Sequence, residues 1–171
     1  MAVEGKSLDK EVHLLSRRPY MMVKKYNSYC INGCTFHTYG YGKGKSTQCY
    51  GVTTVVATSS FSSAKDKNPV AGNVSYYGRI VDILELNYSN EGYAVLFKCD
   101  WVKQTGFRVD GFGLPQVNFK HIYNTEELVS ELFILASQAS QVYYVEDPTK
   151  ADWQFVVTPS PRDLFDMTFS E

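Results

Sequence analysis

The chain has 171 residues, of which 44% are hydrophobic, 15% aromatic and 20% charged. This length fits one domain with extensions, and the apolar content excludes a chain that is disordered throughout. No stretch approaches the ~20 consecutive apolar residues of a membrane-spanning helix. The polar N-terminus has no apolar centre, so we expect no secretory signal and an intracellular protein with reduced cysteines.

The net charge of −1 is distributed unevenly along the chain. Residues 1–50 carry eight Lys or Arg against three Asp or Glu, whereas residues 141–171 carry two against six. The basic N-terminal third is suited to a polyanion, and the acidic C-terminal part would repel one. The slightly negative net charge argues against a protein that coats nucleic acids, because the neutralisation of phosphates by basic side chains supplies most of the nonspecific affinity.

Residues 1–28 are predicted to form an N-terminal extension with one short helix. Val12, Leu14 and Leu15 are too few apolar positions to stabilise an isolated amphipathic helix. A tight turn is predicted at Asn32-Gly33. Residues 39–45 (YGYGKGK) are rich in glycine and are predicted to be a flexible loop or the tip of a hairpin. Residues 40–46 lack the spacing of a phosphate-binding loop.

The middle of the chain has the clearest strand pattern. Residues 50–58 are rich in β-branched side chains and predict a strand, and the polar residues 59–73 predict an exposed loop. Residues 76–101 predict a long hairpin linked by residues 89–92. From residue 93 onwards, apolar side chains occupy alternate positions, which is typical of a strand with one buried face. The first half of the hairpin is apolar on both faces, which indicates a central or bent strand.

Further short strands are predicted at residues 114–119, 141–145 and 153–158. Thr125 is a candidate N-cap for one helical turn, and residues 159–171 are predicted to be a C-terminal tail. Short strands, glycine-containing loops and few helices describe a mainly β protein, either a small barrel or a sandwich. We place this β domain at residues 29–158.

A zinc site is one possible use of Cys30, Cys34, His37 and Cys49, because zinc binds thiolates and imidazoles. If residues 30–38 form a strand, Cys30 and Cys34 share a face and His37 lies on the other. The repeated Cys-x-x-Cys spacing of common structural zinc sites is also absent. We therefore favour ordinary packed side chains and expect no metal and no other cofactor.

Catalytic patterns are weak. His13, His37 and His121 lie in no recognisable hydrolase or metalloprotease motif. A metal-dependent nuclease or transposase would need clustered carboxylates; Asp82, Glu85, Asp100 and Asp110 are the candidates, and we interpret them as solvated charges at sheet edges. The sequence predicts that the chain is not an enzyme and has no small-molecule substrate.

Two sets of residues are candidates for binding. Basic side chains alternate with tyrosines in the N-terminal third, a mixture that suits phosphate contacts and base stacking. The basic set is Arg17, Arg18, Lys24, Lys25, Lys43 and Lys45. The aromatic set is Tyr76, Tyr77, Trp101, Tyr143 and Tyr144, which would hold a methylated lysine by cation–π contacts if the rings formed a pocket. For both sets the alternative is structural, namely a solvated face or core packing.

Several blocks of the sequence occur in the same order in a known family. They are residues 29–33, 36–38, 76–78, 96–101, 133–139 and 144–148. Over about residues 12–166 the chain resembles the plant domain of unknown function found beside transposases of CACTA (En/Spm-type) DNA transposons. The order of its strands is also similar, at the level of fold, to bromo-adjacent-homology (BAH) domains and other SH3-like barrels of chromatin proteins.

The resemblance implies an accessory domain of a transposon-derived protein, with no catalytic residue to carry over. We therefore expect a single small SH3-like or BAH-like, partly open barrel with one or two short helices. The predicted function is a non-enzymatic interaction module that binds a protein or chromatin partner in the nucleus. The alternative is a DNA-binding module that uses the basic N-terminal third. Fold by itself does not decide between them.

Overall fold

The computed structural model describes residues 3–17, 23–60, 70–123 and 133–159. It confirms a mainly β protein with two α-helices. The strands are β1 (Val23–Tyr26), β2 (Ser28–Ile31), β3 (Cys34–His37), β4 (Gly51–Ser60), β5 (Val70–Asn87), β6 (Tyr93–Trp101), β7 (Phe107–Val109), β8 (Pro115–Val117), β9 (Phe133–Leu135), β10 (Ser140–Glu146) and β11 (Gln154–Val157). The helices are α1 (Val3–Leu15) and α2 (Tyr39–Gly42), with single 3-10 turns η1 (Ser89–Glu91), η2 (Gln104–Gly106) and η3 (Ala136–Gln138).

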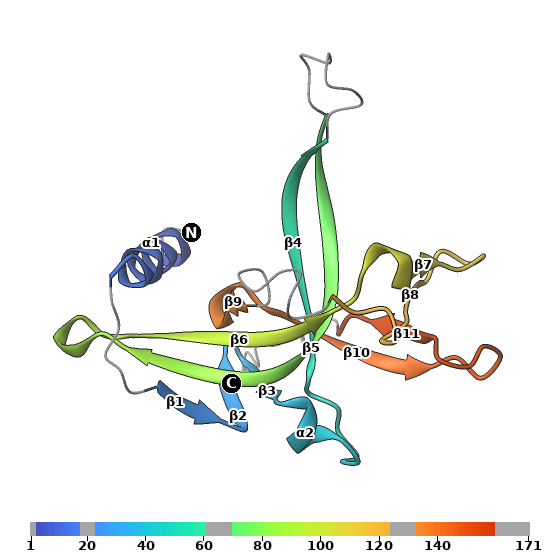
Figure 1. Cartoon of the computed structure of the whole chain (residues 1–171), viewed down its shortest axis with the longest axis horizontal. Coiled ribbons are helices and arrows are strands. Elements are labelled where there is room, and N and C mark those ends of the chain that lie inside the picture. The colour runs from blue at the N-terminus through green and yellow to red at the C-terminus, as the bar shows by residue number, and fades with distance from the viewer. Residues whose placement is uncertain (1–2, 18–22, 61–69, 124–132, 160–171) are drawn as a thin grey trace, which may run out of the picture.

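One antiparallel sheet organises the molecule (Figure 1). Its strand order is β7-β8-β11-β10-β4-β5-β6-β9, and β1 pairs with β5 beside this path. Among the described strands the two ends of the path do not pair with each other, so the sheet is open. The strand β5 is central and bent: it pairs with β4, then β1, on one edge and with β6 on the other, and its register shifts between Ile80 and Asp82.

The sheet packs around two main apolar cores. The first contains Phe36, Ile83, Phe97 and Trp101, and the separate β2–β3 hairpin covers it. The alternation predicted for β6 is confirmed, since Phe97, Cys99 and Trp101 are all buried. The second core lies under β10 and β11 and includes Val117, Val142 and Tyr144. The bend in β5 lets one strand contribute to both cores.

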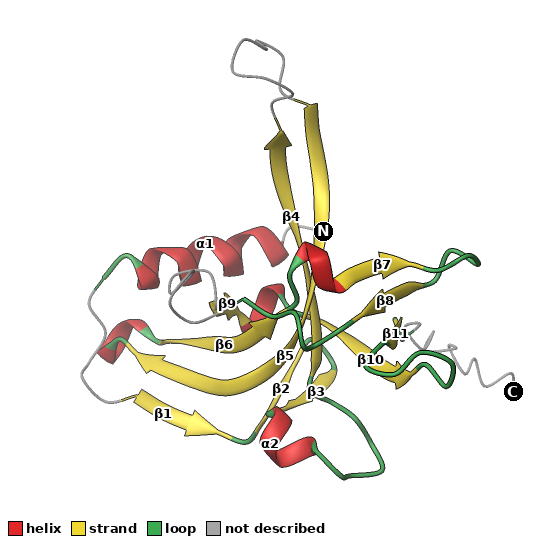
Figure 2. Ribbon diagram, turned by 45° about the vertical axis from the view of Figure 1, so that its right-hand side comes forward, coloured by secondary structure: helices red, strands yellow, loops and turns green. Residues whose placement is uncertain are grey.

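A two-stranded arm projects from this body (Figures 1 and 2). It consists of residues 54–60 of β4 and 70–77 of β5, which pair with each other as far as Ser60 and Val70. The exposed loop predicted for residues 59–73 is therefore too long, because residues 59–60 and 70–73 are strand. Residues 61–69 lie outside the described residues.

Two N-terminal elements, α1 and β1, contact the main sheet directly. Strand β1 falls inside the predicted extension 1–28, yet it pairs with β5 of the main sheet. Helix α1 packs through Leu14 on Tyr88 and Ala94, while Val12 and Leu15 stay exposed. This burial supplies the tertiary support that α1 needs.

Two local predictions have mixed outcomes. The turn at Asn32-Gly33 is confirmed, with φ of 52° and 74° at its two residues. The flexible loop predicted at residues 39–45 begins instead with the single helical turn α2. The predicted N-cap Thr125 lies outside the described residues, as do residues 160–171 of the predicted tail.

Candidate functional site

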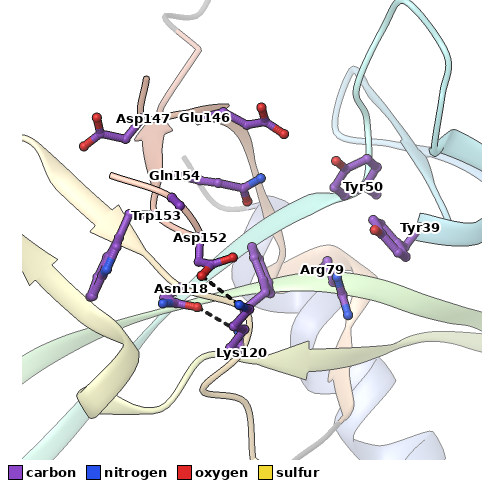
Figure 3. Close-up of a pocket in the computed structure, with 12 residues that line it drawn as sticks. Tyr39, Tyr50, Arg79, Asn118, Lys120, Glu146, Asp147, Asp152, Trp153 and Gln154 are labelled. Carbon is purple, nitrogen blue, oxygen red and sulfur yellow. Dashed lines mark hydrogen bonds and ion pairs between the residues drawn. The ribbon is translucent and has the colours of Figure 1, made fainter. Parts of the chain in front are cut away.

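A pocket of about 550 Å³ opens beside the second core, where α2, β4 and β5 meet the C-terminal strands (Figure 3). Four aromatic rings line it, and they belong to Tyr39, Tyr50, Phe119 and Trp153. Its charged lining residues are Arg79, Lys120, Glu146, Asp147 and Asp152, and its remaining lining residues are Asn118, Ala151 and Gln154. Residues far apart in the sequence thus share one cavity.

Arg79 lies between two aromatic faces of the pocket. Its guanidinium carbon is 4.2 Å from the centre of the Tyr39 ring and 5.0 Å from that of Phe119. Its Nε donates a 3.1 Å hydrogen bond to Asp100 Oδ2. A cation held over two rings and paired with a carboxylate is already well compensated. Arg79 therefore does not neutralise the acidic side chains that line the pocket, and these can attract other positively charged groups.

The opposite wall of the pocket is fixed by a chain of side chains. The Arg108 guanidinium carbon lies 3.6 Å from the centre of the Trp153 ring. Arg108 Nε donates to Gln116 Oε1 at 2.7 Å, and the buried Gln116 donates from Nε2 to Asp147 Oδ2, also at 2.7 Å. These contacts connect β7, β8 and the turn after β10, so they hold Trp153 and Asp147 in place.

Asp147 and Glu146 differ in how they are held. Asp147 Oδ1 accepts hydrogen bonds from the hydroxyl and the backbone N–H of Thr149, at 2.6 and 2.8 Å. These bonds, with the one from Gln116, lower the pKa of Asp147 to about 2. The Glu146 side chain makes no hydrogen bond or ion pair with any described residue, and Figure 3 shows it directed towards Tyr50. Burial raises the pKa of Tyr50, and the nearby Tyr39 and Glu146 add to that effect.

The pocket has an acidic excess. Lys120 Nζ pairs with Asp152 Oδ2 at 2.7 Å, and Arg79 pairs with Asp100 just below the lining. Glu146 and Asp147 have no cationic partner among the described residues. Two carboxylates beside aromatic rings favour a positively charged guest.

The pocket lacks the nucleophile and histidine of a triad-type hydrolase. Its 12 lining residues include no histidine, cysteine, serine or threonine. Within the described ranges, no group of three or more His, Cys, Asp or Glu side chains is placed to hold a metal ion. The arrangement supplies hydrogen-bond acceptors, aromatic faces and negative charge, which are groups for binding.

The predicted basic set does not gather on one face. Lys24 and Lys25 on β1 pair with Glu85 and Asp82 at 3.4 and 3.5 Å, and Arg17 pairs with Glu91. Lys43 and Lys45 follow α2 and lie over the rings of Tyr39 and Tyr41. Arg18 lies outside the described residues. Arg17, Lys24 and Lys25 therefore have acidic neighbours, whereas the neighbours of Lys43 and Lys45 are aromatic rings.

The predicted aromatic set is divided between the two cores. Trp101 is buried in the first core, where Tyr76 packs against it. Tyr77 and the buried Tyr144 belong to the second core, and the half-buried Tyr143 donates its hydroxyl hydrogen to Gln141 Oε1. The five rings do not line one pocket. The pocket that does form is lined by other rings, those of Tyr39, Tyr50, Phe119 and Trp153.

The candidate metal and acidic residues also have structural partners. Cys30 is exposed and contacts Thr35 Oγ1 at 3.2 Å, while Cys49 is buried. His37 is half-buried, and burial followed by the charge of Lys45 lowers its pKa. Asp110 Oδ1 accepts from two backbone N–H groups of its own turn, at Phe112 and Leu114. His13 and His121 are exposed.

Comparison with known proteins finds a match over part of the chain. Residues 84–156 match a family described as a domain of unknown function (DUF4216). No curated protein and no solved structure matches the chain significantly. The matched segment supplies the acidic residues of the pocket together with Phe119 and Trp153, whereas Tyr39, Tyr50 and Arg79 lie before it. No described helix is long and apolar enough to span a membrane.

Proposed function

We propose that this chain is a non-enzymatic interaction module whose pocket binds a lysine or arginine side chain from a basic segment of a partner protein. The observation that carries the proposal is Glu146, an exposed carboxylate without a cationic partner among the described residues, directed towards Tyr50 at the mouth of an aromatic pocket. A cation placed there gains both a charge partner and aromatic faces.

The internal contacts of the pocket support the same conclusion. Arg79 already occupies the space between Tyr39 and Phe119, which shows that these rings accept a guanidinium group. Asp147 stays ionised well below neutral pH, because its pKa is lowered to about 2. At neutral pH this carboxylate therefore carries a negative charge, while lysine and arginine side chains carry a positive one.

The wider context remains part of the proposal. The resemblance to the plant domain found beside CACTA transposases favours an accessory module of a transposon-derived protein, acting on chromatin in the nucleus. A relationship to SH3-like or BAH-like barrels is consistent with an open antiparallel sheet built around a bent central strand. The alternative of DNA binding through the basic set has less support, because its described members are dispersed and Arg17, Lys24 and Lys25 pair with acidic side chains.

Fluorescence anisotropy with short labelled peptides tests the proposal. One peptide carries alternating lysine, arginine and glycine, and its control carries glutamate at each basic position. The basic peptide is expected to bind and the acidic one not. Glu146→Lys should weaken binding by about tenfold or more through charge repulsion, whereas Asp9→Lys, at an exposed position of α1, should change it little. Equal binding of both peptides, or equal effects of both variants, would refute the proposal.

A further inference from the structure

Within the part of the chain that the structure describes, the outer edge of β4 has no neighbouring strand along the arm. Strand β4 pairs with β10 only at residues 51–53, so its outer edge from Thr54 onwards has no partner strand within the described residues. Figures 1 and 2 both show this part of the ribbon standing clear of the body. A free edge presents backbone N–H and C=O groups that another strand can pair with.

The composition of the arm makes its edges unusual. Residues 54–60 and 70–77, which form the arm, contain no charged residue and no proline, in a chain that is 20% charged. Val55 and Val56, on opposite faces, are 59% and 43% exposed. Natural sheets protect free edges with charge, proline or bulges. The absence of these devices on β4 indicates an edge that is covered in the working protein.

The pattern of backbone hydrogen bonds shows which N–H and C=O groups of β4 point away from β5. The carbonyl of Tyr77 accepts a 2.9 Å hydrogen bond from the N–H of Val102, so Tyr77 points its backbone groups away from β4. Thr53 lies opposite Tyr77 in the register. In an antiparallel pair, two opposed residues either bond to each other or both direct their N–H and C=O groups outward, so the backbone groups of Thr53 point away from β5. Alternation along the strand makes Val55 and Ala57 the next residues with outward N–H and C=O groups.

The sequence at this edge is close to palindromic. Residues 54–58 read Thr-Val-Val-Ala-Thr, with Val56 at the centre. In an antiparallel pairing with a second copy, Val56 would lie opposite itself, Val55 opposite Ala57, and Thr54 opposite Thr58. Val55 and Ala57 are the residues with outward groups, so they would form the hydrogen-bonded pairs, and Val56 would form a non-hydrogen-bonded pair.

We propose that the outer edge of β4 pairs with the same edge of a second copy, in a two-fold antiparallel dimer centred on Val56. The pairing ends at Thr54 and Thr58, because Thr53 already pairs with Ser140 of β10. The interface is isologous, as closed two-fold dimers require. No like charges meet across it, and the exposed valines gain apolar contacts.

Sedimentation of the full-length chain over a range of concentrations tests this dimer. The wild type should show twice the mass of one chain. Val56→Lys would set two lysines opposite each other, and Ala57→Pro would remove an outward N–H without touching the β4–β5 ladder. Both should raise the dissociation constant by about tenfold or more. Val109→Lys, at an exposed position of β7, is the control and should leave the dimer intact.

Cross-linking tests the register independently of affinity. Cα atoms of a non-hydrogen-bonded pair lie about 4.5 Å apart, which suits a disulfide. In a Cys30→Ser background, which removes the exposed thiol, Val56→Cys should give a covalent dimer on oxidation. Val55→Cys should cross-link far less, because Val55 would lie opposite Ala57. A wild type that is monomeric at every concentration would overturn the proposal. The partner of the β4 edge would then be a strand of another protein. A dimer that survives both Val56→Lys and Ala57→Pro would also overturn it.

Discussion

The hydroxyl of Tyr144 donates a 2.6 Å hydrogen bond to the carbonyl oxygen of Gly78. Tyr144 lies on β10 and Gly78 on β5, and β4 lies between these two strands in the sheet, so the bond joins strands that are not neighbours. Burial raises the pKa of Tyr144 well above its usual value, so the hydroxyl stays protonated and remains a donor. This contact links the second core to the central strand beside Arg79 of the pocket.

Tyr144→Phe should lower the free energy of unfolding by about 0.5–1.5 kcal/mol, because the hydrogen bond between its hydroxyl and the Gly78 carbonyl is lost. Denaturant unfolding measures the change. Tyr143→Phe is the matched control, since its half-buried hydroxyl bonds to the side chain of Gln141 at 3.2 Å. Equal losses for the two variants would contradict the importance given to the Tyr144 bond.

Gly78→Ala should destabilise the fold by about 1–3 kcal/mol through overpacking. A Cβ atom at Gly78 would lie 2.7 Å from Trp101 Cε3 and 2.8 Å from the carbonyl oxygen of Asp100. The second contact is with backbone, so side-chain movement alone cannot relieve it. Gly40→Ala meets no atom within 4 Å and should leave the thermal midpoint nearly unchanged. A Gly78→Ala midpoint at the wild-type value would contradict this packing.

Trp101→Ala should cost about 3–5 kcal/mol, as expected for removal of a large core side chain. Trp101 is only 5% exposed, which confirms the burial predicted from the alternation in β6. Melting followed by circular dichroism checks the value. Trp153→Ala is the comparison, because Trp153 is partly exposed at the pocket and should cost less. The reverse order would contradict the assignment of Trp101 to the core.

Asp147→Asn should change how stability depends on pH. The folded-state pKa of Asp147 is lowered from 3.8 to about 2, mainly by its bonds with Thr149. A lowered carboxyl pKa contributes stability that is complete above about pH 4 and is lost as the pH falls towards about 2. The variant should therefore lose less stability than the wild type over this acidic window. Urea midpoints measured at several pH values compare the two slopes, and parallel slopes would contradict the assignment.

Regular local patterns made much of the β architecture predictable. Alternation in residues 93–101 predicted the buried face of β6, and the Asn32-Gly33 pair predicted the turn between β2 and β3. Strand β1 was not predicted as part of the sheet. Its sequence, VKKY, is short and charged, and it is stabilised by pairing with β5 and by ion pairs of Lys24 and Lys25. Those partners are known only once the strand register is known.

The pocket could not be predicted for a related reason. Tyr39, Arg79 and Trp153 come from α2, β5 and the turn before β11, and no periodicity connects them. The unevenly acidic C-terminal part was the one sequence signal that pointed towards Glu146 and Asp147. Conversely, the aromatic set chosen from the sequence joined residues such as Tyr76 and Tyr77, whose adjacent positions on one strand send their rings to opposite faces.

Chemical-shift mapping of the isotope-labelled full chain, titrated with the basic peptide, tests the central claim most directly. The account predicts that the largest amide shifts occur at Tyr50, Phe119, Glu146 and Trp153, with a shift of the Trp153 indole N–H, and that Glu146→Lys reduces them. Shifts confined to β1, the arm or the segment after α2, with the pocket resonances unmoved, would contradict it.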